Sequence, residues 1–208
     1  MYYDAVKNAH GLRHDPFKAL VAPRPIGWIS SLDAEGRPNL APYSFFNAIS
    51  DNPHIVIFSS TGWKDSVANV GETGEFVCNL ATWNLRDQMN ATSAPAEHGV
   101  SEFELAGLTE AACNVVKAPR VAETPVAMEC KHLQTIHLKD VDGNDVDRWL
   151  VMGQVVGIHI DDDYVHDGMV DITQLKPLAR LGYKDFSVVD SVFQMTRPAG
   201  GGGGAGGA

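Results

Sequence analysis

Residues 126–160 read VAMECKHLQTIHLKDVDGNDVDRWLVMGQVVGIHI, and this stretch decides the fold. Its two outer parts, 126–138 and 148–160, are rich in the β-branched residues that favour strands. The DVDGND segment at 140–145 lies between them and is rich in residues that form turns. This arrangement predicts a long antiparallel β-hairpin.

Shorter strand signals fill the N-terminal half of the chain. Residues 26–32, IGWISSL, alternate apolar and small polar residues and run into a turn at 33–36. The strand pattern resumes over 40–46, so these segments are expected to form a second hairpin. Short apolar runs at 55–58 and 76–80 follow turn-forming residues, which is typical of buried strands.

Helical signals are fewer. Residues 64–72 carry Val67 and Val70 at helical spacing. Residues 84–91 also predict a helix, with Asn84 as its N-cap. Many strands, local hairpins and few helices favour an antiparallel β-barrel with peripheral helices over a doubly wound sheet. The predicted fold class is therefore mainly β.

The length and composition are those of a single soluble domain. The chain has 208 residues, of which 44% are hydrophobic and 20% are charged, as in ordinary globular proteins. We expect residues 1–198 to form one domain. Residues 199–208 contain only glycine and alanine, which offer little to bury, so this tail is expected to be disordered.

The charge balance argues against two classes of partner. The chain has 16 Lys+Arg and 26 Asp+Glu, which gives a formal net charge of −10. Nucleic acids and anionic membrane surfaces both bind clustered cations, so neither is an expected partner. No apolar run approaches the ~18 residues of a membrane span, and the N-terminus lacks the apolar core of a secretory signal. The chain is expected to be cytoplasmic.

Neither the cysteines nor the histidines are spaced like metal ligands. Cys78, Cys113 and Cys130 are scattered, which predicts reduced thiols in a reducing compartment. The histidines form no tight set, and odd spacings along a strand place side chains on opposite faces. No metal is therefore expected. A GxGxxG motif after a strand and a GxxxxGK[ST] loop, which would indicate nucleotide binding, are also absent from the sequence.

Residues 59–66, SSTGWKDS, could hold an anion. Hydroxyl residues follow a predicted buried strand, and Lys64 and Ser66 lie at the start of a predicted helix. Helix N-termini present unpaired N–H groups and partial positive charge, so these side chains would complete a phosphate site. The alternative is ordinary helix capping, for which the candidate residues are Ser60, Thr61 and Asp65. Spacing alone favours neither interpretation.

Residues 39–47, NLAPYSFFN, could line a flat heterocycle. Asn39, Ser44 and Asn47 offer hydrogen-bonding groups near a predicted strand end, and neighbouring aromatic residues offer rigid walls. The alternative is a core strand with a capped end.

Residues 24–31, RPIGWISS, form a third candidate segment. Arg24 could pair with an anion, and Gly27 could let a ligand ring approach the backbone. The alternative is an edge strand that begins at proline.

Together these segments resemble the flavin reductase-like family with the FMN-binding split barrel, in its flavoredoxin-type branch. The motifs that carry the resemblance are PRPIGWISS, NLAPYSFFNAISDNPHIVIFSS and WKDSVANVGETGEFVCNL, in this order. The closing PLARLGY at 177–183 also fits. The resemblance extends over nearly all of residues 15–186.

The resemblance implies a six-stranded antiparallel split barrel that forms a homodimer and binds FMN in a groove between subunits. By position, Ser59, Ser60 and residues 64–66 would hold the FMN phosphate, and the isoalloxazine would lie against Ser30 and residues 44–47. From the segments and the resemblance together, the predicted cofactor-binding residues are Ser30, Asn39, Ser44, Phe45, Phe46, Asn47, Ser59, Ser60, Lys64, Asp65 and Ser66. No catalytic residue is assigned, since reduction of flavin by a nicotinamide requires no general acid or base.

The resemblance implies an oxidoreductase in which NADH or NADPH reduces FMN. The electrons would then pass to free flavin, oxygen, a partner monooxygenase or another redox protein. Two alternatives stay open: a flavoredoxin-like electron carrier that does not turn over NAD(P)H, and a module that only senses a flat ligand.

Overall fold

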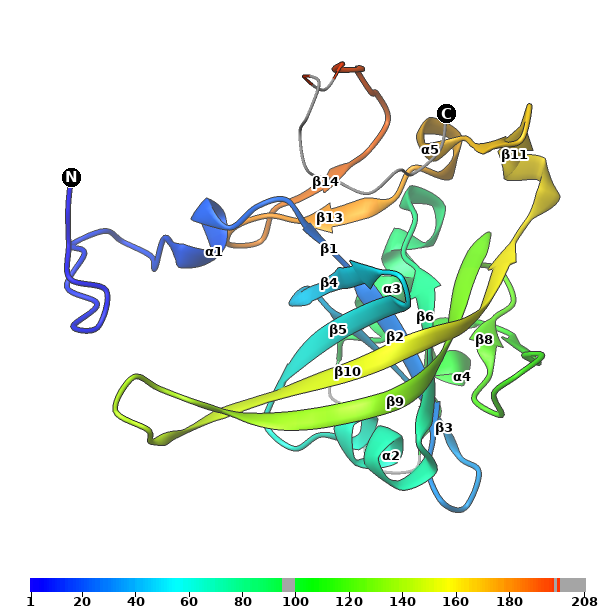
Figure 1. Cartoon of the computed structure of the whole chain (residues 1–208), viewed down its shortest axis with the longest axis horizontal. Helices are drawn as coiled ribbons and strands as arrows, with labels where there is room; N and C mark the ends of the chain where they lie inside the picture. The colour runs from blue at the N-terminus through cyan, green and yellow to red at the C-terminus, as the bar shows by residue number, and fades with distance from the viewer. Residues whose placement is uncertain (95–99, 197, 199–208) are drawn as a thin grey trace.

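The computed structural model describes residues 1–94, 100–196 and 198, so the predicted tail at 199–208 lies outside the described residues. Most of the chain builds one antiparallel sheet in the order β3-β2-β6-β9-β10-β5-β4, which curves around a central core (Figure 1). Its strands are β2 (Gly27–Leu32), β3 (Pro38–Tyr43), β4 (Phe46–Asp51), β5 (His54–Thr61), β6 (Glu75–Leu80), β9 (Val126–Lys139) and β10 (Asp145–Ile160). The mainly β, antiparallel fold predicted from the sequence is confirmed, although the main sheet has seven strands where the resemblance implies six.

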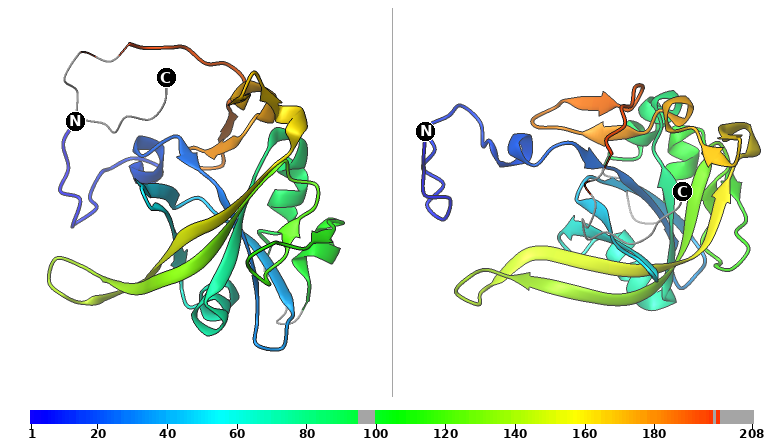
Figure 2. Two further views of the ribbon diagram at one scale, coloured as in Figure 1. Left: turned by 45° about the vertical axis from the view of Figure 1, so that its right-hand side comes forward. Right: turned by 45° about the horizontal axis from the view of Figure 1, so that its top comes forward.

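Strands β9 and β10 form the long hairpin that the sequence predicts, and they lie side by side at the centre of this sheet. Its tip projects well beyond the body of the protein in both views of Figure 2. The turn is closed by Asp140, whose carboxylate accepts hydrogen bonds from the backbone N–H groups of Asp142 (3.0 Å) and Asn144 (2.8 Å). Gly143 supplies the positive φ of 84° that this tight turn requires.

Smaller elements surround the sheet. The minor strands are β1 (Arg24–Pro25), β7 (Glu110–Ala111), β8 (Arg120–Val121), β11 (Val165–His166), β12 (Met169–Val170), β13 (Leu178–Arg180) and β14 (Phe186–Val188). The helices are α1 (Phe17–Leu20), α2 (Asp65–Thr73), α3 (Arg86–Ala91), α4 (Glu102–Ala106) and α5 (Ile172–Leu175), with short 3-10 turns at Trp83–Leu85 and Asp162–Tyr164. Strands β1, β13 and β14 form a separate small sheet, which joins the two ends of the chain.

Two local predictions need correction. The strand expected over 40–46 is two strands, because the chain bends at Ser44 and Phe45 so that β4 can pair with β5 on the far edge of the sheet. The helix expected to begin at Asn84 begins at Arg86, and Asn84 lies in the preceding 3-10 turn. A tertiary hydrogen bond from the Trp83 N–H to the Lys176 carbonyl (2.9 Å) holds that turn in place.

The core has two main parts on either side of the sheet. Inside the curved sheet, α2 packs Val67 and Val70 against buried strand residues such as Phe58 and Phe76. On the other face, Trp28 of β2 is buried beneath α3 and α4. Within the described residues no helix is long and apolar enough to cross a membrane.

Candidate functional site

Two adjoining pockets lie where β3, α1, α2 and the segment after α3 meet, and they share Pro42 and Ser93. We call the first the α2 pocket; it has a volume of about 350 Å³ and its polar lining includes Asn39, Lys64, Asp65, Ser66, Thr92 and Glu102. We call the second the α1 pocket; it has a volume of about 440 Å³ and its lining includes Asp15, Phe17, Lys18, Arg24, Ser44, Arg180, Tyr183 and Phe186. Each is large enough to take part of a small-molecule ligand.

The mouth of α2 has unused hydrogen-bond donors. Lys64 is the N-cap residue, and no side chain caps this helix end. The N–H groups of Val67 and Ala68 donate to the Lys64 carbonyl, whereas the Ser66 N–H has no acceptor among the described residues. The exposed Lys64 ammonium has no hydrogen-bond or ion-pair partner in the part of the chain that the structure describes. The structure thus shows no side-chain cap at the N-cap position, and the phosphate site stays a prediction.

A buried hydrogen-bond network holds the hydroxyls behind this helix mouth. The Asn39 amide donates to the Ser66 Oγ at 2.8 Å. The Tyr43 hydroxyl hydrogen-bonds with Ser66 and Ser60, and burial raises the pKa of Tyr43. The Ser60 Oγ in turn donates to the Gly62 carbonyl at 3.0 Å. The network fixes Ser66 at the pocket wall and leaves Ser60 in the interior.

Glu102 adds a second carboxyl group, besides that of Asp65, to the lining of the α2 pocket. The Glu102 Oε2 accepts a hydrogen bond from the Leu40 N–H at 3.0 Å. Burial, together with the negative charge of Asp65, raises the pKa of Glu102. The α2 pocket therefore combines one ammonium with two carboxyl groups, and an anion would bind at its Lys64 side.

The wall of the α1 pocket is tied together by Arg24. Its guanidinium donates to the carbonyls of Lys18 (2.5 Å), Val21 and Leu181 (2.8 Å), which connects α1 to the turn after β13. The Arg24 Nε is buried without a partner among the described residues. Arg180, which pairs with Arg24 across β1 and β13, stacks its guanidinium over the Phe186 ring, 4.4 Å from the ring centre.

The structure brings part of the predicted residue set together. The predicted residues that line the two pockets are Asn39, Ser44, Lys64, Asp65 and Ser66. The predicted residues that line neither pocket are Ser30, Phe45, Phe46, Asn47, Ser59 and Ser60. The cofactor-binding role of the whole set stays a prediction.

Ser30 and Phe46 show why the second group lies elsewhere. Ser30 is 0% exposed, and its Oγ donates to the Pro119 carbonyl (2.5 Å) and accepts from the Asn79 amide (3.0 Å). Phe46 packs its ring on Gly27, where an added Cβ would lie 2.5 Å from the ring. Gly27 is thus required by Phe46, and no ligand ring is needed to explain it.

Phe45, Asn47 and Ser59 lie on or beside the β4–β5 edge. The exposed Phe45 ring lies between two guanidinium groups, 5.7 Å from that of Arg24 and 5.8 Å from that of Arg148. The Ser59 N–H donates to the Phe45 carbonyl at 2.8 Å. Asn47 is exposed, and its side-chain oxygen accepts from the N–H of the next residue.

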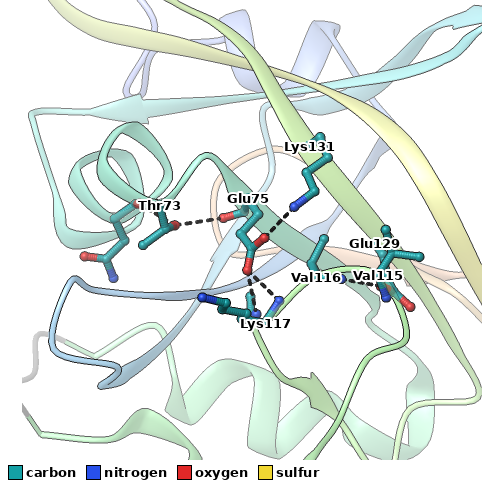
Figure 3. Close-up of polar contacts among 9 residues, drawn as sticks. Thr73, Glu75, Val115, Val116, Lys117, Glu129 and Lys131 are labelled. Carbon is teal, nitrogen blue, oxygen red and sulfur yellow. Dashed lines mark hydrogen bonds and ion pairs between the residues drawn. The ribbon is translucent and has the colours of Figure 1, made fainter.

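Sequence reasoning missed a pair of buried carboxylates, Glu75 on β6 and Glu129 on β9 (Figure 3). Glu75 accepts hydrogen bonds from the N–H groups of Lys117 and Ala118 (3.3 Å) and from the Lys131 ammonium (2.7 Å). The pair therefore anchors the loop before β8 to the barrel.

Glu129 is the more deeply buried of the two, with 1% exposure. It accepts the backbone N–H groups of residues 114, 115 and 116 at 2.9, 2.6 and 2.9 Å and contacts the His159 Nε2 at 2.6 Å. Burial alone would raise its pKa, but these hydrogen bonds lower the pKa of Glu129 to about 2. The carboxylate is thus ionised and fully hydrogen-bonded at neutral pH.

The Cys113 sulfur completes a cluster in which the polar atoms of Cys113, Glu129 and His159 all lie within 4.8 Å of one another. Histidine spacing could not reveal it, because each member comes from a different segment. Burial and the charge of Glu129 raise the pKa of Cys113 to about 11, so its thiol is protonated at neutral pH. Hydrogen bonds account for the closeness of Glu129 and His159.

Comparison with known proteins identifies the family. The family model described as Flavin reductase like domain matches residues 20–178, so the chain belongs to this family. An uncharacterized protein of Aquifex aeolicus is 35% identical over 171 residues, which cover 79% of this chain and 84% of that protein. An uncharacterized protein of Halalkalibacterium halodurans is 32% identical over 183 residues, covering 86% and 87% of the two chains.

Solved structures of flavin reductase-like proteins have a fold similar to that of this chain. Nitrilotriacetate monooxygenase component B from Bacillus cereus is 29% identical, with a TM-score of 0.83, and the match covers 94% of this chain and 98% of that one. A protein from Shewanella frigidimarina described as a flavin reductase with a split barrel domain (24%, TM-score 0.82, covering 95% and 100%) shares the fold. So does flavoredoxin of Desulfovibrio vulgaris (20%, TM-score 0.78, covering 92% and 98%). The resemblance and the split-barrel fold predicted from the sequence are confirmed.

Proposed function

We propose that this protein is an FMN-binding oxidoreductase that takes electrons from NADH or NADPH. The observation that carries the proposal is the Lys64 ammonium, which has no partner among the described residues and lies with Ser66 at the start of α2, beside two adjoining pockets. Backbone N–H groups at a helix start, a hydroxyl and an ammonium are the donors that a phosphate group takes.

The residues present include the donor types that FMN needs. Lys64, Ser66 and the first N–H groups of α2 would hold the phosphate in the α2 pocket. Because Pro42 and Ser93 line both pockets, the pockets adjoin each other, and the flavin ring would extend past these residues toward Ser44 in the α1 pocket. Bound FMN would supply the chemistry, namely accepting a hydride and passing electrons onward. The chain would bind and orient both reactants.

The family and its relatives support this function. The chain belongs to the flavin reductase-like family. A structural relative at 29% identity is named as a monooxygenase component, which suggests that a monooxygenase or another redox protein receives the electrons. Free flavin or oxygen could serve as acceptor in the same way.

The test is reduction of bound flavin by a nicotinamide nucleotide. Purified protein is loaded with FMN, mixed anaerobically with NADH or NADPH, and followed at the flavin absorbance. Loss of the flavin absorbance with at least one nucleotide is expected. If FMN is bound and neither nucleotide reduces it, the reductase function is refuted.

A flavoredoxin-like electron carrier is the second candidate. The observation that favours it is the shared fold with flavoredoxin of Desulfovibrio vulgaris, at a TM-score of 0.78. A carrier would oxidise NAD(P)H slowly but exchange electrons quickly with a reduced protein donor. Stopped-flow comparison of the two rates distinguishes it from a reductase.

We also propose that the protein is a cytoplasmic homodimer. Apolar side chains are exposed on the large sheet, including Ile49 on the edge strand β4 and Ile158 and Ile160 at the end of β10. Exposed apolar residues gathered on one sheet are typical of surfaces that pair with another chain. Sedimentation equilibrium would show twice the chain mass of 22.5 kDa; a purely monomeric protein would refute the dimer.

A further inference from the structure

The α1 pocket collects positive charge in an acidic protein. Lys18, Arg24 and Arg180 all line it, whereas Asp15 is its only acidic lining residue among those the structure describes. None of the three cations forms an ion pair with a carboxylate of the described residues. The Asp15 carboxylate is already engaged, since it accepts from the Phe17 N–H (2.8 Å) and the Asn8 amide (3.3 Å). With three cations and one carboxylate, the lining therefore carries net positive charge.

Arg24 and Arg180 differ in how many donors remain available. Arg24 gives its terminal N–H groups to three carbonyls and is held in the wall. Arg180 donates to the Tyr183 carbonyl and stacks on Phe186, which leaves most of its five N–H donors unused. Burial and the nearby charge of Arg180 lower the pKa of Arg24, which shows that the two guanidinium groups repel each other. An anion between them would relieve this repulsion.

The same pocket has flat apolar walls. Phe17, Tyr183 and Phe186 line it and are exposed. The walls are fixed relative to each other, because Gly182 packs so closely on α1 that an added Cβ would lie 2.5 Å from the Ala19 Cβ. Aromatic side chains beside a guanidinium suit a planar ligand with a charged substituent.

We propose that the α1 pocket binds a planar substrate through its carboxylate or phosphate group, with Arg180 and Lys18 as the residues that recognise the anion. This inference rests on the proposed function, because the substrate would be the molecule that exchanges electrons with FMN. The shared wall at Pro42 and Ser93 places that substrate next to the proposed ring position at Ser44.

The test uses three probes with one ring: benzoate, phenyl phosphate and the neutral benzamide. Their dissociation constants are measured by ligand-observed NMR on the full chain with FMN added, and retained flavin is quantified separately by absorbance. We expect at least one anion to bind about tenfold more tightly than benzamide, as charge-assisted contacts allow. The stronger of the two anions identifies whether the site prefers carboxylate or phosphate.

Three variants locate the contact. R180Q and K18Q should each weaken anion binding several-fold and leave benzamide binding within twofold. The matched control is K117Q, because Lys117 is an exposed lysine that lines neither pocket. K18Q keeps the test valid if R180Q does not fold, since Lys18 is exposed on a short helix.

Equal binding of all three probes, no binding of either anion, or anion binding that neither R180Q nor K18Q weakens would overturn the inference. Failure of the proposed function has a different signature: no flavin is retained, whatever the probes do. Charge-selective binding that both variants weaken supports the inference in either case.

Discussion

The mouth of α2 and the Glu129 site both gather charged side chains and backbone N–H groups, yet they are used in opposite ways. At Glu129, three N–H groups and His159 satisfy one buried carboxylate. At the start of α2, the Lys64 ammonium and the Ser66 N–H meet no acceptor among the described residues. A satisfied buried charge stabilises the fold, whereas unused donors at a pocket wall are available to a ligand.

The largest effect expected from this comparison is on stability. Glu129→Gln leaves buried N–H groups without a charged acceptor and should lower the free energy of unfolding by about 3 kcal/mol. Urea denaturation measures it. The control is Glu110→Gln, since Glu110 is exposed and should change stability by less than about 0.5 kcal/mol. Equal effects of both variants would mean that Glu129 does not anchor the loop.

The same carboxylate makes stability depend on pH. Its folded pKa of about 2 lies below the ordinary value of 4.5, so its contribution is fully present above the ordinary value and is lost as the pH falls toward the folded one. The stability gap between the native protein and Glu129→Gln should therefore shrink when urea denaturation is repeated at about pH 3 instead of about pH 7. A gap that stays constant or widens would disagree with the hydrogen bonds seen at Glu129.

A smaller effect is expected on ligand binding at the other region. Lys64→Ala should weaken FMN binding by about 1–3 kcal/mol, the range for a hydrogen bond to a charged group. Riboflavin binding should hardly change, because riboflavin has no phosphate. Fluorescence titration of both flavins measures this, with Lys117→Ala as the control. Equal losses for both flavins would show that Lys64 does not contact the phosphate.

The smallest effect on stability is expected at Lys131, which lies at the solvent side of Glu75. The Lys131 ammonium contacts Glu75 at 2.7 Å but is half-exposed, and two backbone N–H groups also hold Glu75. Lys131→Met should therefore cost no more than about 1 kcal/mol in urea denaturation. A loss as large as that of Glu129→Gln would mean that the ion pair, rather than the backbone donors, holds the loop.

The sequence predicts the fold well because its signals are local. The β9–β10 hairpin is marked by two β-branched stretches and a turn, and the α2 mouth by the contiguous SSTGWKDS segment. The Glu129 site has no such signal, since its partners in the 114–116 loop and on β10 come together only in the folded chain. The same holds for Ser30. Its hydroxyl bonds to the Pro119 carbonyl and the Asn79 amide in the interior, and no sequence motif indicates these contacts.

The sequence does not predict the α1 pocket either, because its residues also come together only in the folded chain. Lys18 and Arg180 are separated by most of the chain, and only the small sheet of β1, β13 and β14 brings their elements together. The sequence indicates Arg24 as a possible partner for an anion. Its hydrogen bonds to the pocket walls depend on carbonyl groups that the sequence cannot place.

A crystal structure of the protein with FMN is the strictest test of the proposed site. We expect phosphate oxygens within about 3.2 Å of the Lys64 ammonium, the Ser66 hydroxyl and the first N–H groups of α2. A phosphate bound anywhere else, with the α2 mouth still open, would show that these donors do not serve the cofactor.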